Sequence, residues 1–121
     1  MNVGIDIVET QRIQYLIDTY STRFLNKVFT EAEQKYCENT GSPYASYAGR
    51  FAAKEAIRKA LQPMTTLNYL PFLEMEILPG ENGVPVSTIT RSGINQKLKN
   101  ISLSISHEKN HAVACALAEE K

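Results

Sequence analysis

Alternating hydrophobic and polar residues at the start of the chain predict a short strand over residues 3–8. Its two faces carry different residues: Val3, Ile5 and Ile7 on one, and Gly4, Asp6 and Val8 on the other. Hydrophobic residues at spacings of three and four then predict amphipathic helices over about residues 10–20 and 24–28. Thr30 and Glu33 have the spacing of a capping box, which predicts that another helix begins there.

A longer helix is predicted from Ser42 to about Gln62. Proline is favoured in the first turn of a helix, where Pro43 lies, and Pro63 ends the segment. Alanines and a glycine recur along this segment, so it can lie close to a neighbouring element. We therefore expect it to be the central helix of the fold.

The second half of the chain predicts a hairpin after a loop at residues 64–71. Residues 72–78 alternate as a strand, with Glu74 and Glu76 expected to face water. Turn-forming residues then lead into a return strand at residues 84–89.

The remaining elements are a short helix and two strands. The helix is expected over residues 92–98 with Ser92 as its cap, and strands are expected at residues 101–105 and 111–117. One strand, several helices and then mostly strands predict an α+β fold. In it, an antiparallel sheet packs on the one long helix, and residues 1–121 form a single domain.

Composition narrows the class of protein. The 121 residues include 13 Lys and Arg against 13 Asp and Glu, and this balance removes the general electrostatic case for binding nucleic acid. Cys37 and Cys115 form no Cys-x-x-Cys motif, and a pair of cysteines is a poor disulfide framework. The start of the chain has no signal-peptide pattern, and no run of 18 apolar residues occurs, so we expect a cytoplasmic protein that does not span a membrane.

Two carboxylates stand out as candidate metal ligands. Asp6 lies in an apolar strand, and Glu55 lies on the same side of the central helix as Phe51. If they converged on one cation, they would suit Mg²⁺, which takes a few carboxylates and keeps several waters. The plain alternatives are that Asp6 faces solvent or pairs with a nearby Lys or Arg, and that Glu55 pairs with Lys59 on an exposed helix face.

A strand of alternating serines ends in His107, within the run Ser104-Ile105-Ser106-His107. This polar face is either part of a site or simply solvated. A catalytic triad is disfavoured because no Gly-x-Ser-x-Gly elbow occurs. His107 and His111 alone make a weak case for zinc.

Basic side chains form two groups. Arg50, Lys54, Arg58 and Lys59 lie on the central helix, where they either recognise phosphate or form a solvated face. Arg12, Arg23 and Lys27 lie on the early helices, where they either face an acidic partner or have no partner.

Four motifs together resemble a known family. They are Gly4-Ile5-Asp6-Ile7-Val8-Glu9, Gly49-Arg50-Phe51-Ala52-Ala53-Lys54-Glu55-Ala56 with Lys59 one turn later, Gly83-x-Pro85, and Ser104-Ile105-Ser106-His107. In spelling and order they resemble the short 4′-phosphopantetheinyl transferases, and within that family the holo-acyl-carrier-protein synthase type. The resemblance extends from Gly4 to about Leu117.

The resemblance implies an enzyme that moves the phosphopantetheine arm of coenzyme A to a serine of an apo-acyl carrier protein, in fatty-acid synthesis or a related pathway. Asp6 and Glu55 would ligate Mg²⁺, and Lys59 would stabilise the leaving pyrophosphate group. His107 would contact a phosphate of coenzyme A or orient the site.

The resemblance also assigns binding residues. Arg50, Lys54, Gly83 and Pro85 would help to bind coenzyme A, and Arg12, Arg23 and Lys27 would contact an acidic carrier protein. The fold implied is that of the family, assembled as a homotrimer with active sites between subunits, where His107 would face the carboxylates of another chain.

Two features depart from the family pattern. Val8 stands where larger relatives have a third acidic ligand, and the segment after Lys59 lacks an expected glycine-containing loop. Two other functions compete with transfer: a module of the same fold that binds coenzyme A or another nucleotide without catalysis, and a purely structural domain.

Overall fold

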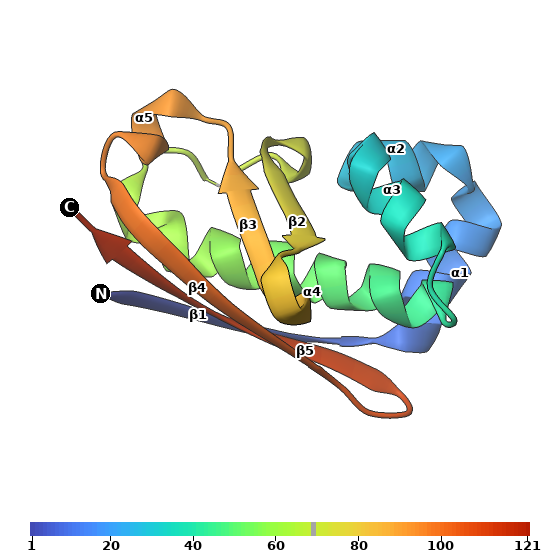
Figure 1. Ribbon diagram of the computed structural model, residues 1–121. Helices are drawn as coiled ribbons and strands as arrows, with labels where there is room; N and C mark the ends of the chain where they lie inside the picture. The colour runs from blue at the N-terminus through green and yellow to red at the C-terminus, as the bar shows by residue number, and fades with distance from the viewer. Residues whose placement is uncertain (69) are drawn as a thin grey trace.

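One long helix, α4 (Pro43–Leu61), lies across a three-stranded antiparallel sheet in the computed structural model, which describes residues 1–68 and 70–121 (Figure 1). The strand order is β1-β5-β4, so the first strand pairs with the last. The three strands are β1 (Asn2–Glu9), β4 (Leu98–His107) and β5 (His111–Glu120). The α+β class and the packing of an antiparallel sheet on the long helix are thus confirmed.

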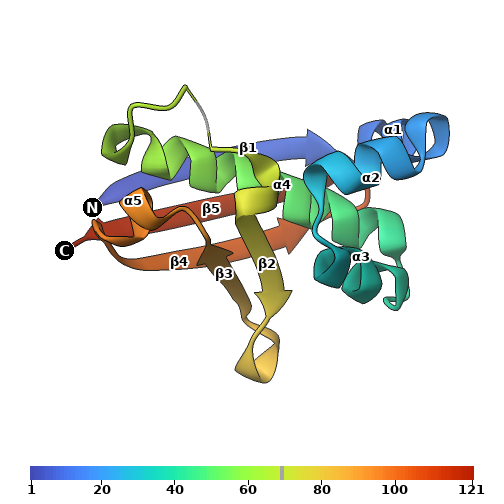
Figure 2. The same cartoon turned by 90° about the horizontal axis from the view of Figure 1, so that it is seen from above.

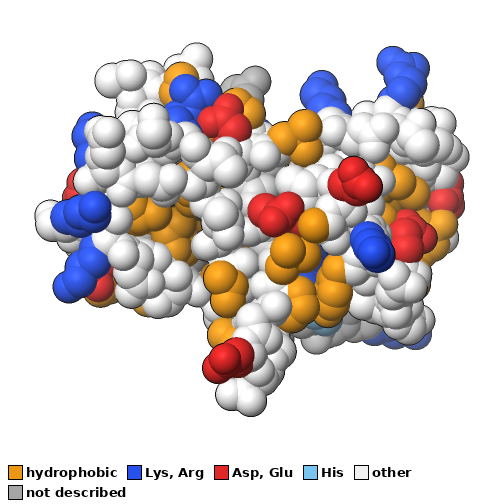
Figure 3. All heavy atoms as spheres, turned by 45° about the horizontal axis from the view of Figure 1, so that its top comes forward, with side chains coloured by type: hydrophobic (Ala, Val, Ile, Leu, Met, Phe, Trp, Pro, Cys, Tyr) orange, Lys and Arg blue, Asp and Glu red, His pale blue; other side chains and the backbone are white. Residues whose placement is uncertain are grey.

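A second sheet was not expected from the sequence. Strands β2 (Met75–Pro79) and β3 (Pro85–Ile89) form a separate two-stranded antiparallel sheet. This hairpin stands beside α4 and next to β4, and its tip projects from the body of the molecule (Figures 2 and 3). A short helix, η3 (Glu81–Gly83), forms the predicted turn at that tip.

The remaining elements are short helices. They are α1 (Thr10–Tyr20), α2 (Thr22–Val28), α3 (Glu31–Glu38), η1 (Gln62–Met64), η2 (Phe72–Glu74) and α5 (Ser92–Asn95). The loop predicted over residues 64–71 includes Tyr69, which lies outside the described residues.

Local signals in the sequence fix several of these boundaries. The capping box at the start of α3 is confirmed, because the Thr30 amide donates to Glu33 Oε1 at 2.9 Å and the Glu33 amide donates to Thr30 Oγ1 at 3.2 Å. The cap predicted at Ser92 is wrong, since Arg91 is the N-cap residue and Ser92 is already helical.

The strand predicted over residues 72–78 is also partly wrong. Residues 72–74 form η2 instead, so the strand begins only at Met75. Glu74 forms an ion pair with Arg91, and the Thr30 hydroxyl donates to Glu76, so both acids have protein partners rather than water alone.

Small residues let β1 lie directly against α4. A Cβ atom added to Gly4 would be 1.9 Å from the Ala56 carbonyl oxygen and 2.7 Å from the Ala60 nitrogen. Alanines are buried at Ala52, Ala56 and Ala60 on α4 and at Ala112, Ala114, Ala116 and Ala118 on β5, which also packs on α4. This close approach places the Gly4 and Asp6 side of β1 against the helix.

The other face of the sheet is exposed, and the side chains of β1 on it are apolar. Val3, Ile5 and Ile7 have 60–64% of their surface exposed, and Leu117 on β5 has 41% exposed. The cross-strand register places Ser102, Ser104 and Ser106 of β4 on the same face. We call this surface the outer sheet face. Burying it requires another protein surface.

Within the described residues, no helix combines the length and the apolar character needed to cross a lipid bilayer. Cys37 and Cys115 are free thiols. A cytoplasmic location stays a prediction.

Candidate functional site

The contact between β1 and α4 brings the first candidate carboxylate to the central helix. Lys59 Nζ donates to the Ile5 carbonyl at 2.8 Å and to Asp6 Oδ1 at 3.3 Å. Only 19% of the Asp6 side chain is exposed, so of its two plain alternatives the pair with a nearby lysine is confirmed and the position that faces solvent is not. Lys59 pairs with Asp6, and not with Glu55 as the helix spacing alone had suggested.

Glu55 lies one helical turn before Lys59, on the same side of α4. Its Oε1 accepts from Arg58 Nη1 at 2.7 Å, and 28% of its side chain is exposed. Asp6 therefore contacts Lys59, Glu55 lies one turn before that lysine on α4, and both carboxylates are partly open to solvent. Two carboxylates of this kind fit Mg²⁺, which retains waters and binds substrate phosphates at its other positions.

Asp6 and Glu55 are too few ligands to hold a metal ion by protein side chains alone. Across residues 1–68 and 70–121, no cluster of three or more His, Cys, Asp or Glu side chains could enclose an ion. His111 is engaged elsewhere, because its Nδ1 lies 2.5 Å from Glu108 Oε1, and this hydrogen bond lowers the pKa of the Glu108 carboxyl.

His107 lies further along the sheet. Its Nε2 is 3.0 Å from the Ala45 carbonyl oxygen. Gly49 makes room for the ring, since a Cβ atom there would be 2.7 Å from Nε2. Gly49 precedes Glu55 by six residues, about 9 Å along the helix axis. One protomer therefore does not bring His107 to the two carboxylates.

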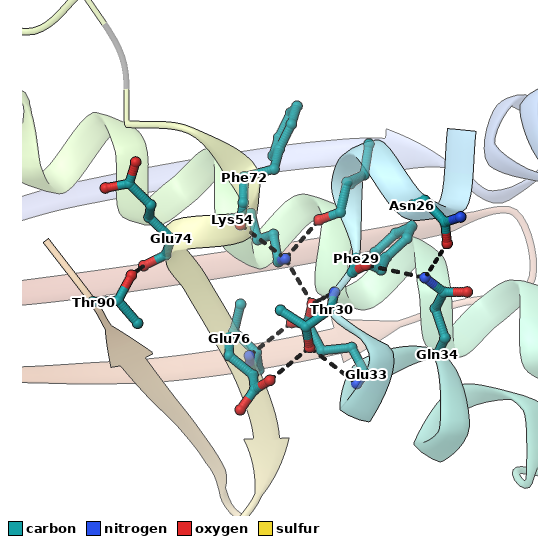
Figure 4. A network of polar contacts seen from close by, with 12 residues as sticks. Asn26, Phe29, Thr30, Glu33, Gln34, Lys54, Phe72, Glu74, Glu76 and Thr90 are labelled. Carbon is teal, nitrogen blue, oxygen red and sulfur yellow. Dashed lines mark hydrogen bonds and ion pairs between the residues drawn. The ribbon is translucent and has the colours of Figure 1, made fainter. Parts of the chain in front are cut away.

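Lys54 does not have the role predicted from the sequence. Its side chain is fully buried, and Nζ donates to Glu33 Oε1 at 2.6 Å, to the Val28 carbonyl at 2.6 Å and to the Phe72 carbonyl at 3.1 Å (Figure 4). Burial lowers the pKa of Lys54, and the charge of Glu33 opposes that shift. An ammonium group has three donors, and all three are used, so none is left for a phosphate of coenzyme A.

Arg50 is also buried rather than part of a solvated face. Its guanidinium lies 4.4 Å from the centroid of the Tyr36 ring, and 7% of the residue is exposed. The Arg50 Nε atom is buried without a hydrogen-bond partner. A contact with coenzyme A stays a prediction for Arg50.

The two residues predicted at the coenzyme A site from the Gly83-x-Pro85 motif lie at the projecting tip of the hairpin (Figure 2). Gly83 has a φ of 75°, a conformation that favours glycine. Pro85 begins β3. The motif therefore shapes the turn, and its contact with coenzyme A stays a prediction.

The three cations assigned to a carrier protein are all exposed. Arg23 and Lys27 line a groove of about 290 Å³ between α1 and α2, together with Leu16, Tyr20 and Phe24. Arg12 lies one turn before Leu16 on α1. A second pocket of about 380 Å³ adjoins this groove at Lys27 and is lined also by Arg58, Pro71, Phe72 and Leu73.

Sequence reasoning missed two long-range partners. Glu33 was identified only as a capping residue, yet it is also the buried counter-ion of Lys54. Arg58 was one of several helix cations, yet it joins Glu55 to Phe72, whose ring centroid is 3.5 Å from the guanidinium. The spacing of residues along one helix allows the Arg58–Glu55 pair, but it carries no signal for the contacts of Lys54 with Glu33 and of Arg58 with Phe72.

Comparisons with known proteins agree with these motifs. Residues 2–117 match the model of the 4′-phosphopantetheinyl transferase superfamily. A holo-[acyl-carrier-protein] synthase of Halothermothrix orenii is 42% identical over 122 residues, which cover 98% of this chain and 96% of the relative. One of Chlamydia muridarum is 44% identical over 117 residues, covering 97% and 93%.

Solved structures show the same fold. The Helicobacter pylori holo-[acyl-carrier-protein] synthase in complex with coenzyme A superimposes with a TM-score of 0.83 at 31% identity, covering 97% of this chain and 99% of that one. The Neisseria meningitidis enzyme gives a TM-score of 0.85 at 29% identity, covering 98% and 97%. This chain therefore belongs to the 4′-phosphopantetheinyl transferase superfamily, in which it is similar to the holo-[acyl-carrier-protein] synthases.

Proposed function

We propose that this protein transfers the 4′-phosphopantetheine arm of coenzyme A to a serine of an apo-acyl carrier protein and releases 3′,5′-adenosine diphosphate. The observation that carries the proposal is the joining of Asp6 to Lys59, one helical turn from Glu55, at the contact between β1 and α4. The relatives named holo-[acyl-carrier-protein] synthase, and the coenzyme A bound to the H. pylori protein, support the same reaction.

The chemistry follows from the charges at this contact. Asp6 and Glu55 would hold Mg²⁺, which supplies positive charge to the pyrophosphate of coenzyme A and orients it. Lys59 adds a second positive charge at the same place. The serine oxygen bonds to the phosphorus next to the pantetheine, the bond to the departing 3′,5′-adenosine diphosphate breaks, and a carboxylate accepts the serine proton. Lys59 serves as a cation rather than a base, because it already donates to Asp6 and to Ile5.

We place the complete active site in a homotrimer. The outer sheet face exposes the apolar side chains of Val3, Ile5, Ile7 and Leu117, as a protein interface does, and further copies of the chain would cover it. Within one protomer, His107 lies away from Asp6 and Glu55. A neighbouring copy would then bring its own His107, Gly83 and Pro85 to these two carboxylates. Arg50, with its unpartnered Nε, is a candidate for a phosphate contact in the same shared site.

The groove between α1 and α2 is the proposed dock for the carrier protein. Arg23 and Lys27 flank an apolar floor, and Arg12 extends the basic surface along α1. A carrier protein that presents an amphipathic, acidic helix beside its acceptor serine would match this apolar groove and its basic edges. Charge complementarity of this type raises the association rate and sets orientation. The free thiols fit a reaction in the cytoplasm.

The test is the release of 3′,5′-adenosine diphosphate, measured by chromatography in mixtures of enzyme, coenzyme A, Mg²⁺ and an apo-acyl carrier protein. We expect one molecule released per carrier molecule, and none with Glu55→Gln or with a chelator. Glu119→Gln is the matched control, since Glu119 is an acid in an ion pair with Lys99. Coenzyme A binding without release would instead support a non-catalytic binding module.

A further inference from the structure

Glu55 is held by an arginine of its own helix. Arg58 Nη1 donates to Glu55 Oε1 at 2.7 Å, and only 14% of the Arg58 side chain is exposed. A carboxylate has two oxygen atoms, each able to accept. Arg58 engages Oε1, which leaves Oε2 as the oxygen that can turn toward a cation.

Residues 70–72 fix Arg58 in turn. Its Nε donates to the Leu70 carbonyl at 2.7 Å, and its guanidinium lies 3.5 Å from the centroid of the Phe72 ring. A planar guanidinium that stacks on a ring and donates to two acceptors has little rotamer freedom left. The orientation of Glu55 therefore depends on a segment that follows α4 in the chain.

That segment is tied to the interior of the molecule. The Phe72 carbonyl accepts from the buried Lys54 at 3.1 Å (Figure 4). The Phe72 ring packs on Phe51 with centroids 5.6 Å apart. Lys54 is itself fixed by Glu33. A continuous set of contacts thus runs from a buried ion pair to the carboxylate of Glu55.

We propose that Arg58 is a positioning residue that holds Glu55 in one orientation, so that a divalent cation meets a ligand already in place. The proposal rests on the proposed function, in which Glu55 and Asp6 hold Mg²⁺. A cation that binds a mobile glutamate has to immobilise it, and an ordered side chain avoids that loss of about three- to tenfold in affinity.

An opposite effect also acts, because the positive charge of Arg58 repels a divalent cation. Two substitutions separate the effects. Arg58→Lys keeps the charge but loses the planar group that stacks on Phe72 and donates in two directions. Arg58→Met removes the charge and keeps a flexible apolar side chain over the ring.

The experiment measures Mn²⁺ binding by electron paramagnetic resonance, with coenzyme A present and no carrier protein. The Mg²⁺ concentration for half-maximal transfer is measured alongside. We expect Arg58→Lys to bind Mn²⁺ about three- to tenfold more weakly and to need correspondingly more Mg²⁺. Its kcat at saturating Mg²⁺ and its KM for the carrier should match the wild type.

Arg91→Lys is the matched control. Arg91 donates to both oxygens of Glu74 at 2.7 and 2.8 Å, and Glu74 lies on the same short helix η2 as Phe72. This variant should bind Mn²⁺ as the wild type does. An equal loss in Arg91→Lys would overturn the proposal, because general loosening of residues 70–74 would then explain the effect.

Two further outcomes are decisive. If Arg58→Lys matches the wild type while Arg58→Met binds Mn²⁺ more tightly, Arg58 acts only through its charge, and the positioning role is refuted. If the wild type itself neither binds Mn²⁺ nor transfers the arm, the proposed function fails and the role of Arg58 falls with it.

Discussion

Lys54→Met should destabilise the fold while leaving the binding of coenzyme A intact. The substitution removes three hydrogen bonds of 2.6, 2.6 and 3.1 Å and leaves the Glu33 carboxylate buried without its counter-ion. Breaking a buried ion pair from one side costs about 3–5 kcal/mol. That is a large part of the roughly 5–15 kcal/mol by which a typical domain is stable.

The assay is urea unfolding followed by circular dichroism, with KM for coenzyme A measured on each folded variant. Lys99→Met is the control, because Lys99 forms an ion pair with Glu119 that is largely exposed, with 64% and 37% of the two side chains accessible. Such pairs contribute about 0–1 kcal/mol. Adding Glu33→Gln to Lys54→Met should recover part of the loss, since it removes the unpaired buried charge.

One result would refute this reasoning. If Lys54→Met kept the stability of the wild type but raised KM for coenzyme A about tenfold, a change equivalent to about 1.4 kcal/mol, Lys54 would be a phosphate ligand after all.

Three further predictions test other parts of the structure. Gly4→Ala should lower the free energy of unfolding by about 3 kcal/mol or more, because its Cβ would lie 1.9 Å from the Ala56 carbonyl oxygen and cannot be accommodated by a side-chain movement; unchanged urea unfolding would contradict the contact between β1 and α4. Ile5→Asp places a charge on the outer sheet face, and we expect folded monomers in sedimentation velocity; a trimer that persists would contradict the proposed interface. Burial raises the pKa of Cys37 from 9.0 to about 12, so above pH 9 the unfolded chain loses a proton that the folded chain keeps. Between pH 9 and pH 12 the free energy of unfolding should therefore fall more steeply in the wild type than in Cys37→Ala, by up to about 1.4 kcal/mol per pH unit. If urea unfolding gave the same dependence on pH for both proteins, this prediction would be wrong.

Hydrophobic spacing was sufficient to place the main elements. The helix beginning at Pro43 and the first strand have boundaries close to those predicted, because each has a clear period and clear end signals. The pattern could not say which face of the strand is buried. Alternation defines two faces, and here the apolar one is outside because Gly4 lies against Ala56 and Ala60.

In the candidate site, too, some contacts could be predicted from the sequence and others could not. The family motifs identified Asp6, Glu55 and Lys59, and the structure places Asp6 in contact with Lys59. Lys54 was misassigned because its partner, Glu33, lies on another helix 21 residues away in the chain. Helical spacing gives the direction of a side chain but not what fills the space in front of it.

The most direct test of the central claim is the intact mass of an apo-acyl carrier protein after incubation with this protein, coenzyme A and Mg²⁺. Parallel mixtures contain Asp6→Asn, Glu55→Gln or a chelator. The account predicts that the carrier gains the mass of one phosphopantetheine group with the wild type, and that the gain disappears in all three parallel mixtures. A gain that persists in any of the three parallel mixtures, or no gain with any carrier, would contradict it.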